Sequence, residues 1–171
     1  MPFLAALLAV ALAGPADVAS LTTAADVVVR ARVVRLTSAW VDGTPASGLI
    51  ATTVELQPTE WWKRAAQTGT LSVRVPGGVV GDLGQLSPGA PSFTEGEEVV
   101  VFLRRLAPRQ HLYSVERWSL GKFSVRAQTR ALRSREGVTC RGCRPGEPDE
   151  LSLKELRERV RAAQPRAGGA R

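Results

Sequence analysis

The sequence predicts a mainly β protein: a small barrel of five or six strands followed by one amphipathic helix. Three observations carry this prediction. Apolar and polar residues alternate from residue 25 to about residue 125, which is the period of two typical of strands. Turns rich in glycine and proline separate the apolar runs, and a clear helical period appears only after residue 150. Many short strands joined by such turns favour a small barrel or sandwich.

Six strands are expected, each with an apolar face. In the first, Val27 and Val29 lie on one face and Arg30 and Arg32 on the other. The fourth (EEVVVFLR) is the most apolar, so we expect neighbours to cover both of its faces. The six expected strands are residues 27–36, 49–57, 70–75, 97–104, 111–118 and 120–127.

Two connecting segments need a separate interpretation. Residues 76–96 would form an unusually long loop for a compact domain, so we expect them to carry a short strand or to fold over the barrel mouth. Residues 58–67 (PTEWWKRAAQ) carry a helical signal. There Pro58 can start a turn, and Trp61 and Trp62 can anchor it to the barrel.

The pattern changes after residue 135. Residues 136–150 are rich in glycine, proline and charge and predict irregular structure. Ser152 and Glu155 then form a capping box, in which Ser152 accepts the amide of Glu155 and the Glu155 side chain reaches back. We expect a short amphipathic helix at 152–163, ended by Pro165. The chain therefore divides into a barrel domain at 21–135 and a segment at 136–171 that holds a CxxC motif, the helix and a disordered tail.

The first twenty residues are typical of a signal peptide. The apolar run from Phe3 to Ala13 has about 11 residues, which is too short to cross a bilayer as a helix and fits a signal-peptide core. Cleavage is plausible after Ala13 or after Ser20, and a short buried N-terminal helix remains the alternative. We expect an exported protein, periplasmic or extracellular, without a transmembrane anchor.

Residues 25–126 resemble a group of exported bacterial proteins of uncharacterised function. The shared pattern is a run of spaced glycines followed by P-x-F-x-x-G-E before an apolar strand. More distantly, the strand order resembles the OB-type barrel of netrin-like domains and tissue inhibitors of metalloproteinases. That resemblance implies an OB-like barrel and a protease inhibitor as one functional alternative. Those inhibitors chelate zinc through an N-terminal cysteine, and neither Gly14 nor Leu21 supplies one.

Histidine and cysteine counts restrict the chemistry. The chain has one histidine, His111, and two cysteines, Cys140 and Cys143, which excludes metal sites built on two histidines. In an oxidising compartment the two cysteines are expected to form a local disulfide, while labile thiols or a redox or metal role stay open. No G-x-S-x-G elbow presents a nucleophile to His111. We expect no cofactor.

Charge is distributed unevenly along the chain. Between residues 104 and 144, eleven cations face two glutamates, giving a net charge of +9, whereas the rest of the chain carries −2. Such a field can steer acidic partners, although a solvated basic face is the simpler reading. The candidate basic surface consists of Arg104, Arg105, Arg109, Arg117, Arg126, Arg130, Arg133 and Arg135.

Three smaller candidate sites complete the survey. Trp61 and Trp62 form a candidate aromatic surface, because adjacent residues cannot easily enter one core. A glycine-lined loop that could bind an anion or a peptide consists of Gly77, Gly78, Gly81 and Asp82, although its glycines also suit a scaffold. A carboxylate cluster that could bind calcium or serve in acid–base work consists of Asp82, Glu95, Glu97 and Glu98.

Together these patterns favour an exported, non-enzymatic binding protein. Its expected partner is a protein or an anionic component of the cell envelope, and nucleic acid is not favoured in an exported protein. A netrin-like protease inhibitor and a small hydrolytic enzyme are the alternatives.

Overall fold

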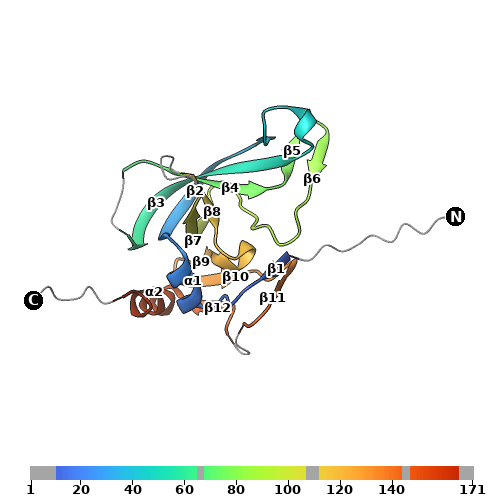
Figure 1. The fold of residues 1–171 in the computed structure, drawn as a ribbon. Coiled ribbons are helices and arrows are strands. Elements are labelled where there is room, and N and C mark those ends of the chain that lie inside the picture. Colours follow the sequence, from blue (N-terminus) through green and yellow to red (C-terminus); the bar gives the residue numbers. More distant parts are fainter. Residues whose placement is uncertain (1–10, 65–67, 107–111, 144–146, 166–171) are drawn as a thin grey trace, which may run out of the picture.

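The computed structural model describes residues 11–64, 68–106, 112–143 and 147–165 (Figure 1). It confirms a mainly β fold with a closed five-stranded barrel. The barrel strands follow the order β7-β2-β3-β4-β8, and β8 pairs again with β7 to close the circle. Among the pairs of neighbouring barrel strands that the structure describes, β4 with β8 is the parallel one and the others are antiparallel. A small closed barrel of five strands is OB-like. Its strands are β2 (Val27–Trp40), β3 (Ile50–Lys63), β4 (Leu71–Pro76), β7 (Glu98–Arg105) and β8 (Leu112–Val115).

The barrel interior is filled by one face of each strand. Val27, Val29 and Ala31 of β2 point inward, as do Val99 and Val101 of β7. This is the face that the period of two identifies, because successive side chains of a strand alternate between its two sides. Tyr113 of β8 also lies fully buried in this core.

A second core lies on the outside of β2 and β7. Val28, Val100 and Phe102 point away from the barrel and pack against this second core. It is covered by three further strands, which extend the sheet from the first half of β7 in the order β9-β10-β12, and by two helices. These elements are β9 (Lys122–Arg126), β10 (Arg130–Arg133), β12 (Glu150–Ser152), α1 (Val18–Ala24) and α2 (Leu153–Ala162). Strand β7 is therefore covered on both faces, as its sequence predicts.

The expected helical segment at 58–67 is wrong over the residues that the structure describes. Strand β3 continues through Lys63, and Trp61 pairs with Val29 of β2. Pairing with β2 overrides the local helical preference, because each backbone group finds a partner in the neighbouring strand. The adjacent tryptophans then take opposite faces: Trp61 packs against the barrel core and Trp62 against the second core.

The long connection between β4 and β7 contains a small hairpin. Strands β5 (Gly78–Val80) and β6 (Leu83–Gln85) pair with each other only, and Figure 1 shows them beside the end of the barrel. A short strand in this stretch is thus confirmed. Two 3-10 turns, η1 (Pro45–Ser47) and η2 (Trp118–Gly121), complete the connections.

The C-terminal helix is confirmed, with one difference in its cap. The hydroxyl of Ser152 accepts a hydrogen bond from the Glu155 amide at 3.1 Å. The Glu155 carboxylate, however, pairs with Arg159 one turn later instead of reaching back. Leu153, Leu156 and Val160 bury the apolar stripe of the helix in the second core.

The folded domain extends beyond both expected boundaries, residue 21 at the start and residue 135 at the end. Strand β1 (Ala11–Ala13) pairs in parallel with β11 (Val138–Cys140), and α1 packs into the second core. The segment expected to be irregular therefore carries β11 and also leads into β12. No helix in the described part of the chain is long and apolar enough to cross a membrane.

Candidate functional site

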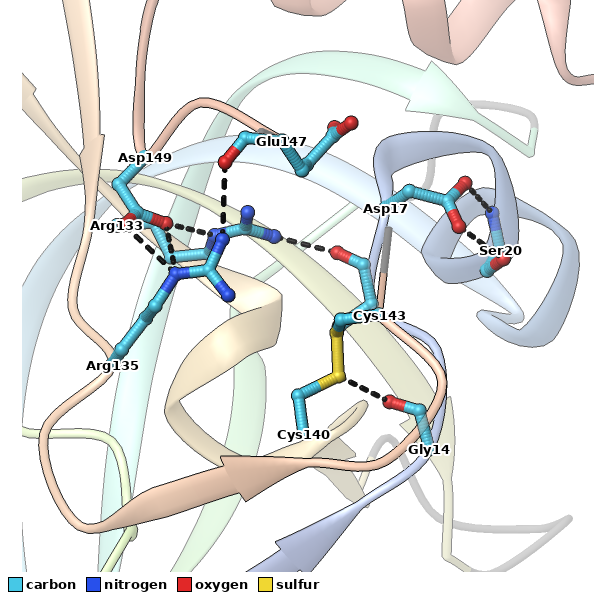
Figure 2. Close-up of a disulfide and its surroundings, with 10 residues drawn as sticks. Gly14, Asp17, Ser20, Arg133, Arg135, Cys140, Cys143, Glu147 and Asp149 are labelled. Atoms are coloured by element: carbon cyan, nitrogen blue, oxygen red, sulfur yellow. Dashed lines mark hydrogen bonds and ion pairs between the residues drawn. A yellow bond between two sulfur atoms is a disulfide. The ribbon is translucent and has the colours of Figure 1, made fainter. Parts of the chain in front are cut away.

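The cysteine pair lies where the N-terminal segment of the described chain meets β11. Cys140 ends β11, and the sulfur atoms of Cys140 and Cys143 lie at disulfide distance, with Cα atoms 5.6 Å apart (Figure 2). The Cys140 sulfur is 3.1 Å from the carbonyl oxygen of Gly14, and the Arg141 amide donates to the Ala13 carbonyl at 2.7 Å. The disulfide thus braces the N-terminal segment against β11.

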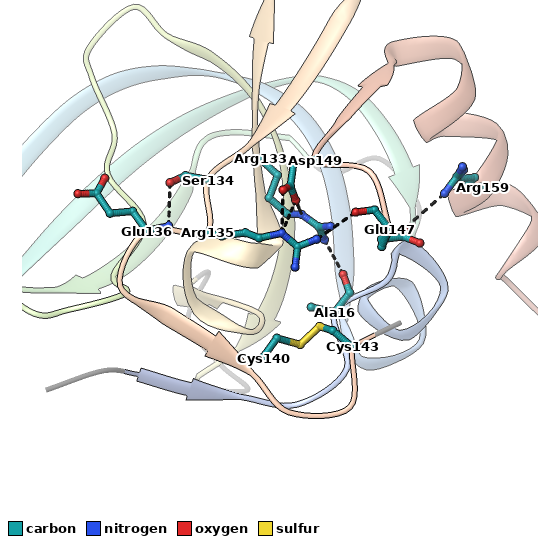
Figure 3. Close-up of polar contacts among 10 residues, drawn as sticks. All are labelled: Ala16, Arg133, Ser134, Arg135, Glu136, Cys140, Cys143, Glu147, Asp149 and Arg159. Atoms are coloured by element: carbon teal, nitrogen blue, oxygen red, sulfur yellow. Dashed lines mark hydrogen bonds and ion pairs between the residues drawn. A yellow bond between two sulfur atoms is a disulfide. The ribbon is translucent and has the colours of Figure 1, made fainter. Parts of the chain in front are cut away.

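Two arginines of the candidate basic surface belong to this junction instead of facing solvent freely. The Arg133 side chain is 1% exposed, donates to the Ala16 carbonyl at 2.5 Å and pairs with Asp149 at 3.2 Å (Figure 3). Burial lowers the pKa of Arg133, although a guanidinium still keeps its proton at neutral pH. Arg135 shares Asp149, with 2.6 Å between its Nε and Oδ1. The guanidinium groups of Arg133 and Arg135 thus stabilise the fold through their ion pairs with Asp149.

The other arginines of that surface are scattered. Arg104 pairs with Glu116 at 2.8 Å and Arg130 with Glu150. The guanidinium of Arg105 lies over the Tyr113 ring, 5.8 Å from its centre. Arg126 is exposed, whereas Arg109 and His111 lie outside the described residues. Five of the eight, including Arg117, face a carboxylate within 4.0 Å, but they share the three carboxylates of Glu116, Asp149 and Glu150, so only part of the positive charge that the sequence counts is locally balanced.

The most distinctive cavity lies outside the barrel wall, next to the N-terminal segment. Its volume is about 320 Å³. Arg74 of β4 lines it, since the neighbours of Arg74 on both sides point into the barrel, and Ser114 of β8 lines it for the same reason. Arg117 and Trp118 follow β8, and Gly14 lines the cavity beside the Arg117 guanidinium. We call this hollow the arginine cavity.

Two lining residues of the arginine cavity have an unusual backbone. Arg117 (φ 56°) and Trp118 (φ 59°) are consecutive residues in the left-handed region, where a side chain costs about 1 kcal/mol or more. The turn is held in place because the Glu116 amide donates to Phe102 at 2.8 Å and the Ser119 amide donates to Gly89 at 2.9 Å. The turn between β9 and β10 has the same left-handed pair at Ala127 (φ 47°) and Gln128 (φ 60°), so this conformation is typical of a tight turn and fixes where the two side chains begin.

The buried Glu116 orients the guanidinium group of Arg117. Glu116 is only 5% exposed, and its carboxylate lies 2.8 Å from Arg104 and 3.4 Å from Arg117. Trp118 is 36% exposed, so part of its ring faces solvent. The cavity therefore offers two guanidinium groups, one hydroxyl and an indole, and no carboxylate lines it among the residues that the structure describes.

The glycine-lined loop does not form one site. Gly77 and Gly78 lie at the start of the hairpin, whereas Gly81 and Asp82 form its exposed tip. A Cβ on Gly78 would come within 2.4 Å of both the Ser38 and Thr52 hydroxyls, so close packing requires glycine there. This geometry accounts for the glycine pair as scaffold.

The acidic residues also separate. Glu97 pairs with Lys122 at 2.8 Å, and Glu98 pairs with Arg30 at 2.5 Å. Glu95 accepts the Leu36 amide at 3.1 Å, and Asp82 stays at the hairpin tip. Among the described residues, no group of three histidine, cysteine or acidic side chains could hold a metal ion.

Trp62 borders a second cavity of about 350 Å³ between β3 and α2. Its indole donates to Glu60 at 3.2 Å, and Glu60 also pairs with Arg30 and with Arg157. Burial opposes ionisation of Glu60, but the hydrogen bonds from Arg30 and Trp62 outweigh it and lower the pKa of the carboxyl. Glu60 is thus paired on the protein, and its ion pair with Arg157 ties α2 to the barrel.

Sequence reasoning identified Arg117 but missed Arg74 and Ser114 as its neighbours. Both come from strands expected in the sequence, but only the barrel order places β4 next to β8. No family model matches the chain, and no curated protein matches it either.

Proposed function

We propose that the chain is an exported, non-enzymatic binding protein that holds an acidic saccharide in the arginine cavity. The observation that supports this most strongly is the combination of Arg74, Arg117 and the half-exposed Trp118 around one hollow of about 320 Å³. Sites for small ligands begin at about 300 Å³, so one sugar ring with its acidic group is a fitting size.

Each lining group has a role in this proposal. A guanidinium presents paired N–H donors that match a carboxylate or sulfate, and two of them favour a ligand with negative charge. The indole of Trp118 offers a flat apolar face for the ring of the sugar, with a polar N–H at its edge. Ser114 supplies a small donor and acceptor for a sugar hydroxyl.

The same lining favours binding over catalysis. A guanidinium does not release its proton in a protein, and an indole only donates. The carboxylate that contacts Arg117, Glu116, is buried and is paired with both Arg104 and Arg117. General acid–base work needs a group that exchanges protons near neutral pH.

Export is supported by the leader-like first residues and by the Cys140–Cys143 pair. Disulfides form and persist in oxidising compartments such as the periplasm or the exterior. An acidic polysaccharide of the cell envelope is a ligand of the proposed kind that such a protein would meet.

The test is a calorimetric titration of the purified protein with tetragalacturonate, with the neutral tetrasaccharide of galactose as the comparison. We expect the acidic sugar to bind and the neutral one to bind at least tenfold more weakly, since a hydrogen bond to a charged group contributes about 1.5–3 kcal/mol. Binding should weaken with added salt. Equal affinity for both sugars, or no binding of either, would contradict the proposal.

Variants locate the site. Arg117→Gln and Trp118→Leu should each lower the affinity at least about fivefold, whereas the matched control Arg126→Gln removes an exposed arginine elsewhere and should change it less than twofold. Thermal melts of all three confirm that the fold persists. An effect of Arg126→Gln as large as that of Arg117→Gln would point to nonspecific charge attraction instead.

A further inference from the structure

We infer that export processing cuts the chain between Ala13 and Gly14, so that the mature protein begins at Gly14 on the edge of the arginine cavity. This inference rests on the proposed export. The sequence leaves two cleavage sites open, because small residues precede both Gly14 and Leu21, as cleavage requires. The fold distinguishes between them.

Cleavage after Ser20 would remove part of the second core. Ala16 is 1% exposed and Val18 is 2% exposed, and both pack in that core. The new α-ammonium group would then sit on Leu21, whose exposure is 0%. A charge buried without a partner is strongly unfavourable, so the helix would have to come apart to hydrate it.

The same cut would remove two polar supports. Asp17 caps α1, accepting the Ser20 amide at 3.0 Å and the Ser20 hydroxyl at 2.7 Å (Figure 2). The buried Arg133 would lose the Ala16 carbonyl at 2.5 Å, one of the acceptors that satisfy its charge. A buried charge that loses an acceptor destabilises the fold.

Cleavage after Ala13 has much smaller consequences. It removes the short pairing of β1 with β11 and one small side chain of the second core, the buried Ala13. It also removes the hydrogen bond from the exposed Arg141 amide, and water can replace that bond. Residues from Gly14 onward keep the contact with Cys140, the cap and the buried helix. Gly14 is only half-buried, so its ammonium group can be hydrated at the chain end.

The cut also changes the arginine cavity. Ala13 and Gly14 both line it, and a Cβ on Gly14 would lie 3.3 Å from the Arg117 guanidinium carbon. Removal of Ala13 therefore opens that edge and leaves an ammonium group beside the guanidinium of Arg117. An added positive charge there strengthens the attraction of an acidic ligand.

The experiment is expression of the full chain in a bacterial host, followed by intact mass measurement of the periplasmic product. A product that begins at Gly14 is the expected result. A product that begins at Leu21, or at any other internal residue, overturns this inference while export stands. A chain retained in the cytoplasm with its first residues intact overturns the proposed export, and this inference with it.

Two substitutions sharpen the assignment. Ala13→Phe places a large residue before the proposed cut and should abolish the Gly14 terminus, whereas Ser20→Phe should leave it unchanged. If Ser20→Phe shifts the terminus and Ala13→Phe does not, the cut lies after Ser20.

A stability comparison tests the physical reason without any export step. Purified chains that begin at Gly14 and at Leu21 should differ in thermal midpoint by at least about 10 °C, with the shorter chain the less stable. Equal midpoints would show that residues 14–20 are dispensable and would overturn the inference.

Discussion

The barrel interior and the second core share strand β7, yet they draw on the sequence in different ways. The barrel interior takes alternate residues from consecutive strands, such as Val99 and Val101 of β7. The second core takes the residues between them, such as Val100 and Phe102, and covers them with segments from both ends of the chain. The barrel strands thus bury their own inner face. The outer face of β2 and β7 is buried only when the two helices and the strands β9, β10 and β12 cover it.

The largest effect is expected from neighbouring residues that face the two cores. Phe102→Ala should destabilise the second core by about 3–5 kcal/mol, and Leu103→Ala the barrel by about 2–5 kcal/mol, because each leaves a cavity among fully buried side chains. Chemical denaturation monitored by tryptophan fluorescence and by circular dichroism measures both.

If the two cores form one cooperative unit, each variant shifts a single transition seen by both probes. Two separate transitions in Phe102→Ala, with the barrel signal unchanged, would show that the second core unfolds on its own.

The next effect concerns the ion pair between the buried Arg133 and Asp149. Asp149→Asn leaves the buried Arg133 without its carboxylate partner and should lower the free energy of unfolding by about 1–3 kcal/mol. Glu150→Gln, next in the chain, breaks an exposed pair with Arg130 and should cost less than about 1 kcal/mol. Equal losses would mean that Arg133 is hydrated in solution.

Loss of the disulfide should lower the free energy of unfolding by less than the upper end of the range expected for Asp149→Asn. Its loop spans only four residues, so the chain-entropy model gives about 2 kcal/mol for the Cys140→Ser and Cys143→Ser double variant. Hydrogen exchange should become faster in β11 and at residues 14–17, while the amides of β2 and β3 stay protected. A uniform loss of protection would place the disulfide at the centre of the fold instead.

The smallest effect is a dependence on pH at the junction of β3 and α2. The lowered pKa of Glu60 means that its contribution to stability is present above the ordinary carboxyl pKa of about 4.3. That contribution is lost as the pH falls through the lower value in the folded state. Glu60→Gln should therefore flatten the acid side of the stability profile, measured by thermal melts between about pH 3 and about pH 7, a range that spans the ordinary carboxyl pKa of about 4.3. An unchanged profile would contradict the assigned pKa direction.

Sequence periodicity identified the barrel interior and, in the second core, the C-terminal helix α2, but it did not identify the part of that core that α1 contributes. Val27, Val29 and their counterparts alternate within single strands, so a local pattern reveals their face. Ala16 and Val18 lie in the stretch whose composition is typical of a signal peptide, and the helix α1 that Val18 begins packs against α2, more than one hundred residues away in the chain. The stretch from Pro58 to Lys63 was expected to be helical because its local preference does not include the pairing with β2.

The candidate site shows the same limit. Charge counting identified Arg117 within a basic stretch, and the structure places most of its basic neighbours in ion pairs. Arg74 meets Arg117 only because β4 and β8 run in parallel side by side, a pairing between segments about forty residues apart. Such juxtapositions follow from topology and have no signature in the local sequence.

The most direct test of the proposed site is nuclear magnetic resonance of the isotope-labelled protein titrated with tetragalacturonate. The account predicts shifts that cluster at the indole N–H of Trp118 and at the amides of Arg74, Ser114 and Arg117. Shifts centred on the hairpin tip at Gly81 and Asp82 or on Arg126, or a spectrum that does not change, would contradict it.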